Sequence, residues 1–116
     1  MTIREYYEKM GADYDDAFGR LMKDERILKY LRMFAAGKDL EQFDEALAAE
    51  NYEDAFRFVH NLKGVSLNLG LTPLAKSSSV LCDALRHGKP TEDISGMIAA
   101  VKEDHAKIVG IIAEIG

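Results

Sequence analysis

The sequence predicts an all-α fold, an antiparallel up-and-down four-helix bundle with additional short helices at its N-terminus. No stretch alternates apolar and polar residues with β-branched enrichment, as a strand would. Capping residues and glycines punctuate the chain at helical intervals, and only two prolines occur. The connections expected after Gly37 are short, and short connections make neighbouring helices antiparallel.

The N-terminal part of the chain contains signals for three helices, each with a residue that begins or ends it. The expected helices are residues 3–10, capped by Thr2 with Glu5 and ended by Gly11; about residues 14–22, capped by Asp13; and a helix from Asp24 to Gly37. Apolar residues recur at helical spacing in the third of these, which gives it one buried face.

Four longer helices are expected to form the bundle. The first covers about residues 40–49 and is capped by Asp39 with Gln42, and the second runs from Asn51 to Gly70. The third begins with Thr72 and Pro73 and runs to about Arg86. The fourth begins after Thr91 and covers about residues 92–114. Whether the third and fourth helices of the chain form one kinked element stays open. We expect one domain over residues 1–116, with accessory helices over about 1–36 and a bundle core over about 39–115.

Composition excludes several classes of function. The net charge of −5 gives no general electrostatic support for nucleic-acid binding. A single cysteine, Cys82, excludes an internal disulfide and a thiolate zinc cluster. The apolar stretches are too short to span a membrane, and the N-terminus lacks the pattern of a signal peptide. We expect a cytoplasmic monomer, and the initial Met1 together with a last helix that closes near Gly116 favours a stand-alone protein.

The helix after Asn51 carries the residues with the clearest chemical meaning. At about 100° per residue, His60 falls at the edge of the apolar arc around Val59, where its imidazole is open to water on one side. Lys63 lies one turn further on, so its ammonium can reach a group attached to His60. Gly64 costs about 1 kcal/mol relative to alanine within a helix, and close approach by a partner would explain its presence.

Neutral imidazole nitrogen is a nucleophile that can form a covalent intermediate. A phosphoryl group on His60 would be negatively charged, and Lys63 would partly offset that charge. The alternative is that His60 is simply a packed surface residue at the rim of an apolar face. The other histidines, His87 and His105, lack the spacing of a metal site and have structural explanations at a helix end and on an apolar face.

The segment His60, Asn61, Leu62, Lys63 and Gly64 resembles the signature of histidine-containing phosphotransfer (HPt) domains, in which His-x-Leu-Lys-Gly is followed by a glycine at the end of the helix. The later part of this pattern is matched by Gly70, Leu71 and Leu74, and the resemblance covers about residues 10–88. After Gly64 the chain has Val65, Ser66 and Leu67 where many family members have smaller residues, which makes this surface more apolar.

The resemblance implies that His60 accepts a phosphoryl group from an aspartate of a receiver domain, that Lys63 stabilises it electrostatically and that Gly64 gives the partner access. The partners implied are response regulator receiver domains, a hybrid sensor histidine kinase, or both. The domain would be a phosphoryl carrier without a nucleotide site or cofactor of its own, and the Mg²⁺ used in transfer would belong to the receiver domain.

The partner-binding surface is expected to include Phe56, Arg57, Asn61 and Leu67. For Phe56 and Leu67, two interpretations stay open: they complete the core, or they form an apolar ring for a receiver-domain helix. Family members often orient the histidine with a polar side chain of the next helix, for which the candidates are Ser77, Ser78, Ser79 and Cys82.

Two other functions compete with phosphotransfer. One is a non-catalytic HPt-like helical adaptor that binds a signalling partner without phosphorylation. The other is an enzyme or metalloprotein built on a four-helix bundle. This sequence argues against it, because it lacks the inward-facing acids and the paired Glu-x-x-His motifs of such sites. Exposure of His60 beside Lys63 separates phosphotransfer from the adaptor.

Overall fold

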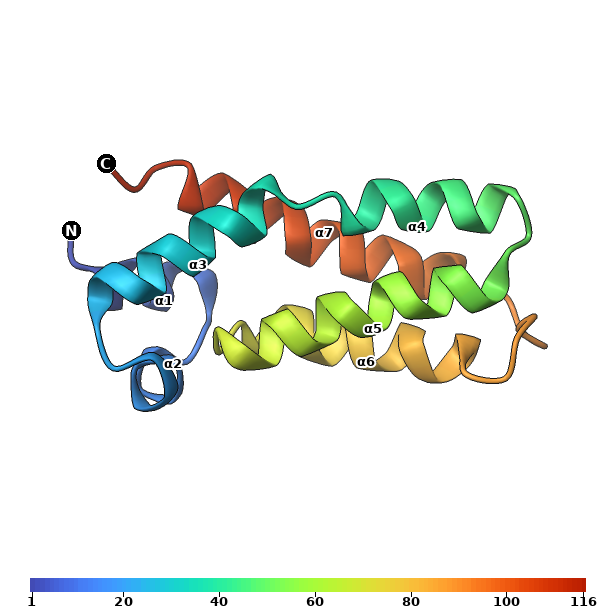
Figure 1. Ribbon diagram of the computed structural model, residues 1–116, viewed down its shortest axis with the longest axis horizontal. Helices are drawn as coiled ribbons and strands as arrows, with labels where there is room; N and C mark the ends of the chain where they lie inside the picture. The colour runs from blue at the N-terminus through green and yellow to red at the C-terminus, as the bar shows by residue number, and fades with distance from the viewer.

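The computed structural model describes residues 1–116, which form seven helices and no strand (Figure 1). The helices are α1 (Ile3–Met10), α2 (Tyr14–Leu21), α3 (Asp24–Ala36), α4 (Asp39–Ala48), α5 (Tyr52–Asn68), α6 (Thr72–Leu85) and α7 (Ser95–Ile112). The predicted all-α fold is confirmed. None of the helices combines the length and the apolar character that a membrane span requires.

The last four helices form an antiparallel bundle, as predicted. Helix α5 packs between α4 and α6, and α7 packs against α6 on the other side. Figure 1 shows α3 and α4 end to end along α7, so they lie in one line but are separate helices. The break falls at Gly37 and Lys38, where the backbone leaves the helical conformation. Helices α1 and α2 close the end of the bundle at which both termini lie.

A single apolar core connects all of these helices. Its 23 buried residues come from every helix, so α1 and α2 share one core with the bundle. The largest fully buried side chains include Tyr7 and Met10 of α1 and Phe43 of α4. The N-terminal helices are therefore held by burial of large side chains as well as by their connections.

Three of the predicted helix caps are present. The Thr2 hydroxyl accepts a hydrogen bond from the Glu5 N–H at 3.2 Å, and the Glu5 carboxylate accepts one from the Thr2 N–H at 3.0 Å. The carboxylate of Asp13 caps α2. The amide oxygen of Asn51 caps α5 by accepting the N–H of Asp54 at 3.1 Å. Each cap joins residues three apart, so the local sequence suffices to predict it.

Two predicted caps are wrong by one residue. Asp39 is the first residue of α4 rather than its N-cap, and Lys38 precedes it without a side-chain cap. The expected pairing of Asp39 with Gln42 is therefore absent. Thr72 is likewise the first residue of α6, because Leu71 occupies the N-cap position, and its hydroxyl donates to the Gly70 carbonyl at 3.3 Å instead.

The last helix is shorter than predicted at both ends. It begins at Ser95 and ends at Ile112, rather than extending over 92–114. The carboxylate of Asp93 accepts the N–H of Ser95 at 2.9 Å, which fixes a turn in the residues expected to be helical. Thr91 therefore lies in the connection and caps nothing.

Candidate functional site

The helix α5 that carries His60 is fixed at its C-terminal end by the N-terminal helices. The last carbonyl groups of a helix lack partners within it, and burial without partners is costly. Four consecutive carbonyls here accept hydrogen bonds from the region of α1 and α2. Leu67 and Asn68 accept from the Arg20 guanidinium, Leu69 accepts from the Tyr7 hydroxyl at 2.8 Å, and Gly70 accepts from the Asp13 N–H at 2.8 Å.

The Tyr7 and Arg20 contacts also suit the charge of this helix end. Burial raises the pKa of Tyr7 far above its usual range, so the hydroxyl remains a neutral donor. The Arg20 cation lies at the negative end of the α5 dipole and also pairs with Asp16. These contacts hold α5 in register against α2 and give the His60 surface a rigid support.

The His60 ring is exposed and is contacted from two sides. Phe56, one turn earlier on α5, stacks against it with ring centroids 5.6 Å apart and an angle of 21° between the planes. The Sγ atom of Cys82 on α6 lies 3.9 Å from His60 Nδ1, a weak hydrogen-bond contact. Nδ1 is thus the ring nitrogen that the protein contacts, and Nε2 of this exposed residue has no hydrogen-bond partner in the protein.

Cys82 is the one candidate on α6 that reaches the ring. Ser78 is buried and its hydroxyl has no partner, while the Ser77 hydroxyl donates to the Leu74 carbonyl. Ser79 is partly buried and lines a groove beside Lys63. Burial raises the pKa of the Cys82 thiol against the opposing charges of Arg86 and Lys63, so the thiol stays protonated at neutral pH.

Two cations flank this arrangement. Lys63 is partly buried one turn after His60 and acts electrostatically on Cys82, which touches the imidazole ring. Arg86, at the end of α6, lies over the Phe56 ring at 5.5 Å from its centroid and pairs with Asp83 at 3.0 Å. The position of Arg86 was not predicted. The available signal was its spacing of four residues from Cys82, which places both on one face of α6.

The surface around Gly64 is uncovered. A Cβ atom at this glycine would have no neighbour within 4 Å apart from its own helix. Leu67, one turn further, is 53% exposed, so it does not complete the core. Phe56 is partly buried and packs against the core while it also stacks on His60. The sequence left open whether Phe56 and Leu67 complete the core or form an apolar surface for a partner. In the structure the two residues differ: Leu67 is available at the surface, whereas Phe56 packs against the core and supports the imidazole.

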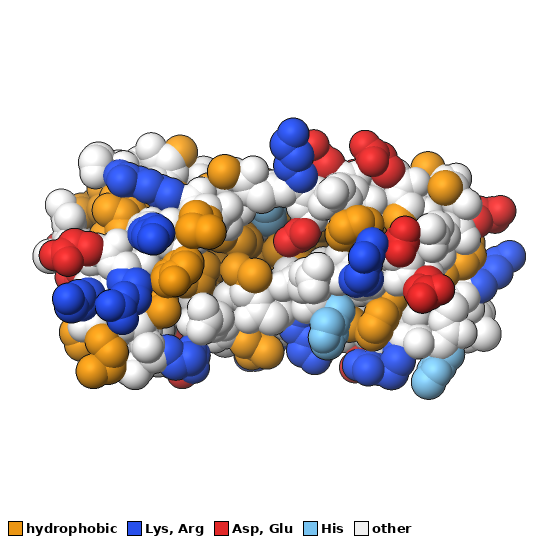
Figure 2. Space-filling view, viewed as in Figure 1, with side chains coloured by type: hydrophobic (Ala, Val, Ile, Leu, Met, Phe, Trp, Pro, Cys, Tyr) orange, Lys and Arg blue, Asp and Glu red, His pale blue; other side chains and the backbone are white.

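The two remaining predicted surface residues are both exposed on α5. Arg57 is exposed, pairs with Asp54 at 3.3 Å and lies over the Phe58 ring. Asn61 is exposed beside His60 on α5. In Figure 2, histidine side chains near the lower margin lie among Lys and Arg side chains, whereas Asp and Glu gather toward the upper right.

No group of three or more His, Cys, Asp or Glu side chains is placed to hold a metal ion. His60, Cys82, Lys63 and Arg86 instead combine a solvent-facing nucleophilic nitrogen with nearby positive charge. Such an arrangement suits the capture of an anionic, electrophilic group delivered from outside the protein.

Comparison with known proteins gives one match. A family model described as Hpt domain matches residues 30–108, which include His60 and most of the bundle and leave α1 and α2 outside. The searches of curated proteins and of solved structures gave no match.

Proposed function

The chain belongs to the Hpt domain family of histidine phosphotransfer modules, and we propose that its phosphoacceptor is His60. In this proposal, Nε2 attacks the phosphorus of an aspartyl phosphate in a receiver domain. The N–P bond forms as the P–O bond to the aspartate breaks, and the electron pair leaves with the carboxylate. The same steps in reverse deliver the phosphoryl group to a response regulator.

The observation that carries the proposal is an exposed histidine whose Nδ1 is contacted from within the protein and whose Nε2 has no protein partner, beside an uncovered glycine. Attack through Nε2 requires the tautomer that carries its proton on Nδ1, and Cys82 Sγ is a weak acceptor for that proton. Lys63 and Arg86 would stabilise the charge on the equatorial oxygens during transfer. The uncovered surface at Gly64 and Leu67 would receive the partner, which supplies the Mg²⁺.

The direct test is transfer from a panel of phosphorylated receiver domains to the purified chain. We expect a label on the chain that acid removes and alkali preserves, as for a phosphoramidate. If no receiver transfers a label while one or more still bind in a titration, the non-catalytic adaptor would replace this proposal.

Removal of the Lys63 charge is expected to slow transfer while the fold is retained. The ammonium acts on charge that develops at the phosphoryl group, so we expect Lys63→Ala to lower the transfer rate on the order of tenfold or more. Single-turnover transfer measures this rate, and a thermal melt checks the fold. Lys63→Arg should restore part of the rate, and Lys29→Ala, which removes an exposed lysine of α3, should have no effect. If Lys29→Ala lowered the transfer rate equally, Lys63 would act only through the net charge of the protein and not through its position beside His60.

Cys82 is expected to act as a positioning residue for the imidazole. Cys82→Ala removes the contact to Nδ1, so we expect a several-fold lower transfer rate and a shift in the tautomer populations of His60. Nitrogen chemical shifts of the ring report those populations directly, and a merely structural role would leave them unchanged. Cys82→Ser, which keeps a polar group, should recover part of both effects. Unchanged ring shifts in Cys82→Ala would assign the thiol to packing alone.

A further inference from the structure

A groove lies between α3 and α5, on another side of α5 from His60. It arises because α3 packs against α2 and α7 whereas α4 packs against α5, so the break at Gly37 leaves part of α5 uncovered. The volume of this α3–α5 groove is about 370 Å³, within the usual range of small-molecule sites. Val65 lines it and follows His60 by five residues, which places the two about 140° apart around the helix.

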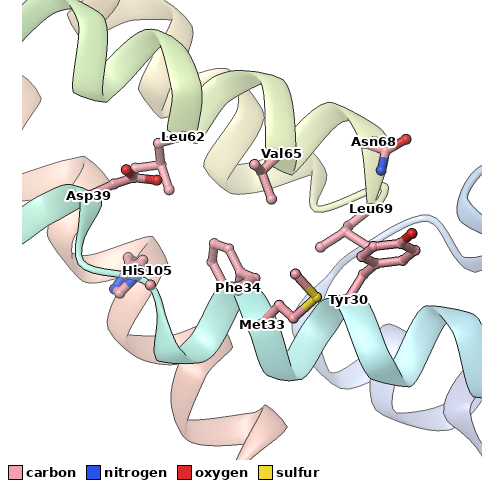
Figure 3. Close-up of a pocket in the computed structure, with 10 residues that line it drawn as sticks. Tyr30, Met33, Phe34, Asp39, Leu62, Val65, Asn68, Leu69 and His105 are labelled. Atoms are coloured by element: carbon pink, nitrogen blue, oxygen red, sulfur yellow. The ribbon is translucent and has the colours of Figure 1, made fainter.

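The middle of the α3–α5 groove is apolar. Phe34 and Leu62 form its deeper surface and are 8% and 2% exposed. Met33 and Val65 face each other across it from α3 and α5, as Figure 3 shows, and are 58% and 37% exposed. An apolar ligand body placed here would remove these four side chains from water, which is favourable in proportion to the area covered.

One end of the groove is polar and carries an unpaired acid. Asp39 and His105 both line this end (Figure 3). The Asp39 carboxylate is partly buried and takes part in none of the salt bridges or hydrogen bonds of the chain. Burial raises the pKa of Asp39 and lowers the pKa of His105. The electrostatic interaction between the two residues opposes both shifts. At neutral pH, this end therefore combines an anion with a neutral imidazole, which can accept a hydrogen bond.

We propose that the α3–α5 groove binds a small organic cation, with its apolar body between Met33, Phe34, Leu62 and Val65 and its ammonium group at Asp39. A partly buried carboxylate without a donor favours a ligand that supplies both positive charge and N–H groups. The neutral His105 ring can accept a second N–H, and the adjacent Phe34 ring adds a favourable face for the cation. This site is separate from the phosphotransfer surface and does not depend on that function.

Three probes of similar shape separate the charge from the apolar body: 4-phenylbutylamine, 4-phenylbutan-1-ol and 4-phenylbutyrate. Each is titrated into the full chain and followed by amide and methyl NMR. We expect the amine to shift the Met33 and Val65 methyl signals and the amides around Gly37. The alcohol should bind about tenfold more weakly, since it lacks the charged hydrogen bond, and the carboxylate should not bind. Equal binding of all three, or no binding of the amine at millimolar concentration, would overturn the proposal.

Two pairs of variants locate the site. Asp39→Asn should abolish the preference for the amine over the alcohol, whereas Glu41→Gln removes the same charge from the same helical turn and should preserve it. Val65→Trp should fill the groove and block all probes, whereas Val80→Trp, at an exposed valine of α6, should not. If both members of a pair behave alike, the amine binds elsewhere. His60→Gln should retain amine binding, so failure of this site and failure of phosphotransfer are distinguishable.

Discussion

The variant His60→Gln is expected to lose phosphoryl incorporation completely while it keeps the fold. Glutamine is polar and of similar length, but its amide nitrogen is not a nucleophile under these conditions. The His60 ring is exposed, and its contacts are a stack on Phe56 and a weak contact to Cys82, so little stability depends on it. Labelling from a phosphorylated receiver, with mass spectrometry to locate the phosphoryl group, measures the loss.

The matched control is His87→Gln, which removes another exposed histidine that lies outside α5. It should be labelled at the wild-type rate and melt at a similar temperature. A label that persists in His60→Gln, or that disappears in His87→Gln, would move the acceptor to another residue. Receiver binding by His60→Gln should survive, since Gly64 and Leu67 are unchanged.

The sequence was sufficient for features that depend on neighbours along the chain. The capping bonds of Thr2, Asp13 and Asn51 each join residues three apart, and they occur where the residue pattern predicts them. The placement of His60 at the edge of an apolar face follows from helical periodicity alone. The break near Gly37 was visible as a glycine between two helical patterns, although the sequence could not decide whether the helix bends or stops there.

Features that depend on how helices are rotated against one another could not be predicted. Ser77, Ser78, Ser79 and Cys82 lie within two turns of α6, and only the packing of α6 on α5 determines that Cys82 faces Nδ1. The stack of Arg86 on Phe56 has the same origin. Asp39 was predicted to be the N-cap of α4 because its spacing to Gln42 is that of a capping pair. In the structure, α3 diverges from α5, and the Asp39 carboxylate lies at the groove between them instead.

The N-terminal helices lie outside the region that matches the family, yet they hold the end of the helix that carries His60. Four carbonyls at and just after its C-terminal end accept hydrogen bonds from this region, and the last of them, that of Gly70, accepts from the Asp13 backbone N–H. Helices α1 and α2 thus support the C-terminal end of α5. Gly70 is where this arrangement is most sensitive to a single change.

The variant Gly70→Ala is expected to destabilise the protein strongly. Gly70 has a φ of +66°, and an alanine Cβ there would collide with the Asp13 carbonyl oxygen and lie 3.3 Å from its carbon. Strain in the left-handed conformation and disruption of the hydrogen bond to Asp13 together cost roughly 2–5 kcal/mol. For a chain of this size we expect the melting temperature to fall by about 10–20 °C, as measured by calorimetry or circular dichroism.

Gly64→Ala is the matched substitution, since it adds the same methyl group six residues earlier. Gly64 lies within α5 with no atom near the new Cβ, so alanine should stabilise the helix by up to about 1 kcal/mol. Opposite signs for the two variants would show that Gly70 is required by the contact with Asp13, whereas Gly64 gives up stability to leave the surface beside His60 open. A melting temperature for Gly70→Ala equal to that of the wild type would mean that the α1–α2 connection shifts freely, and would remove its role as a support for α5.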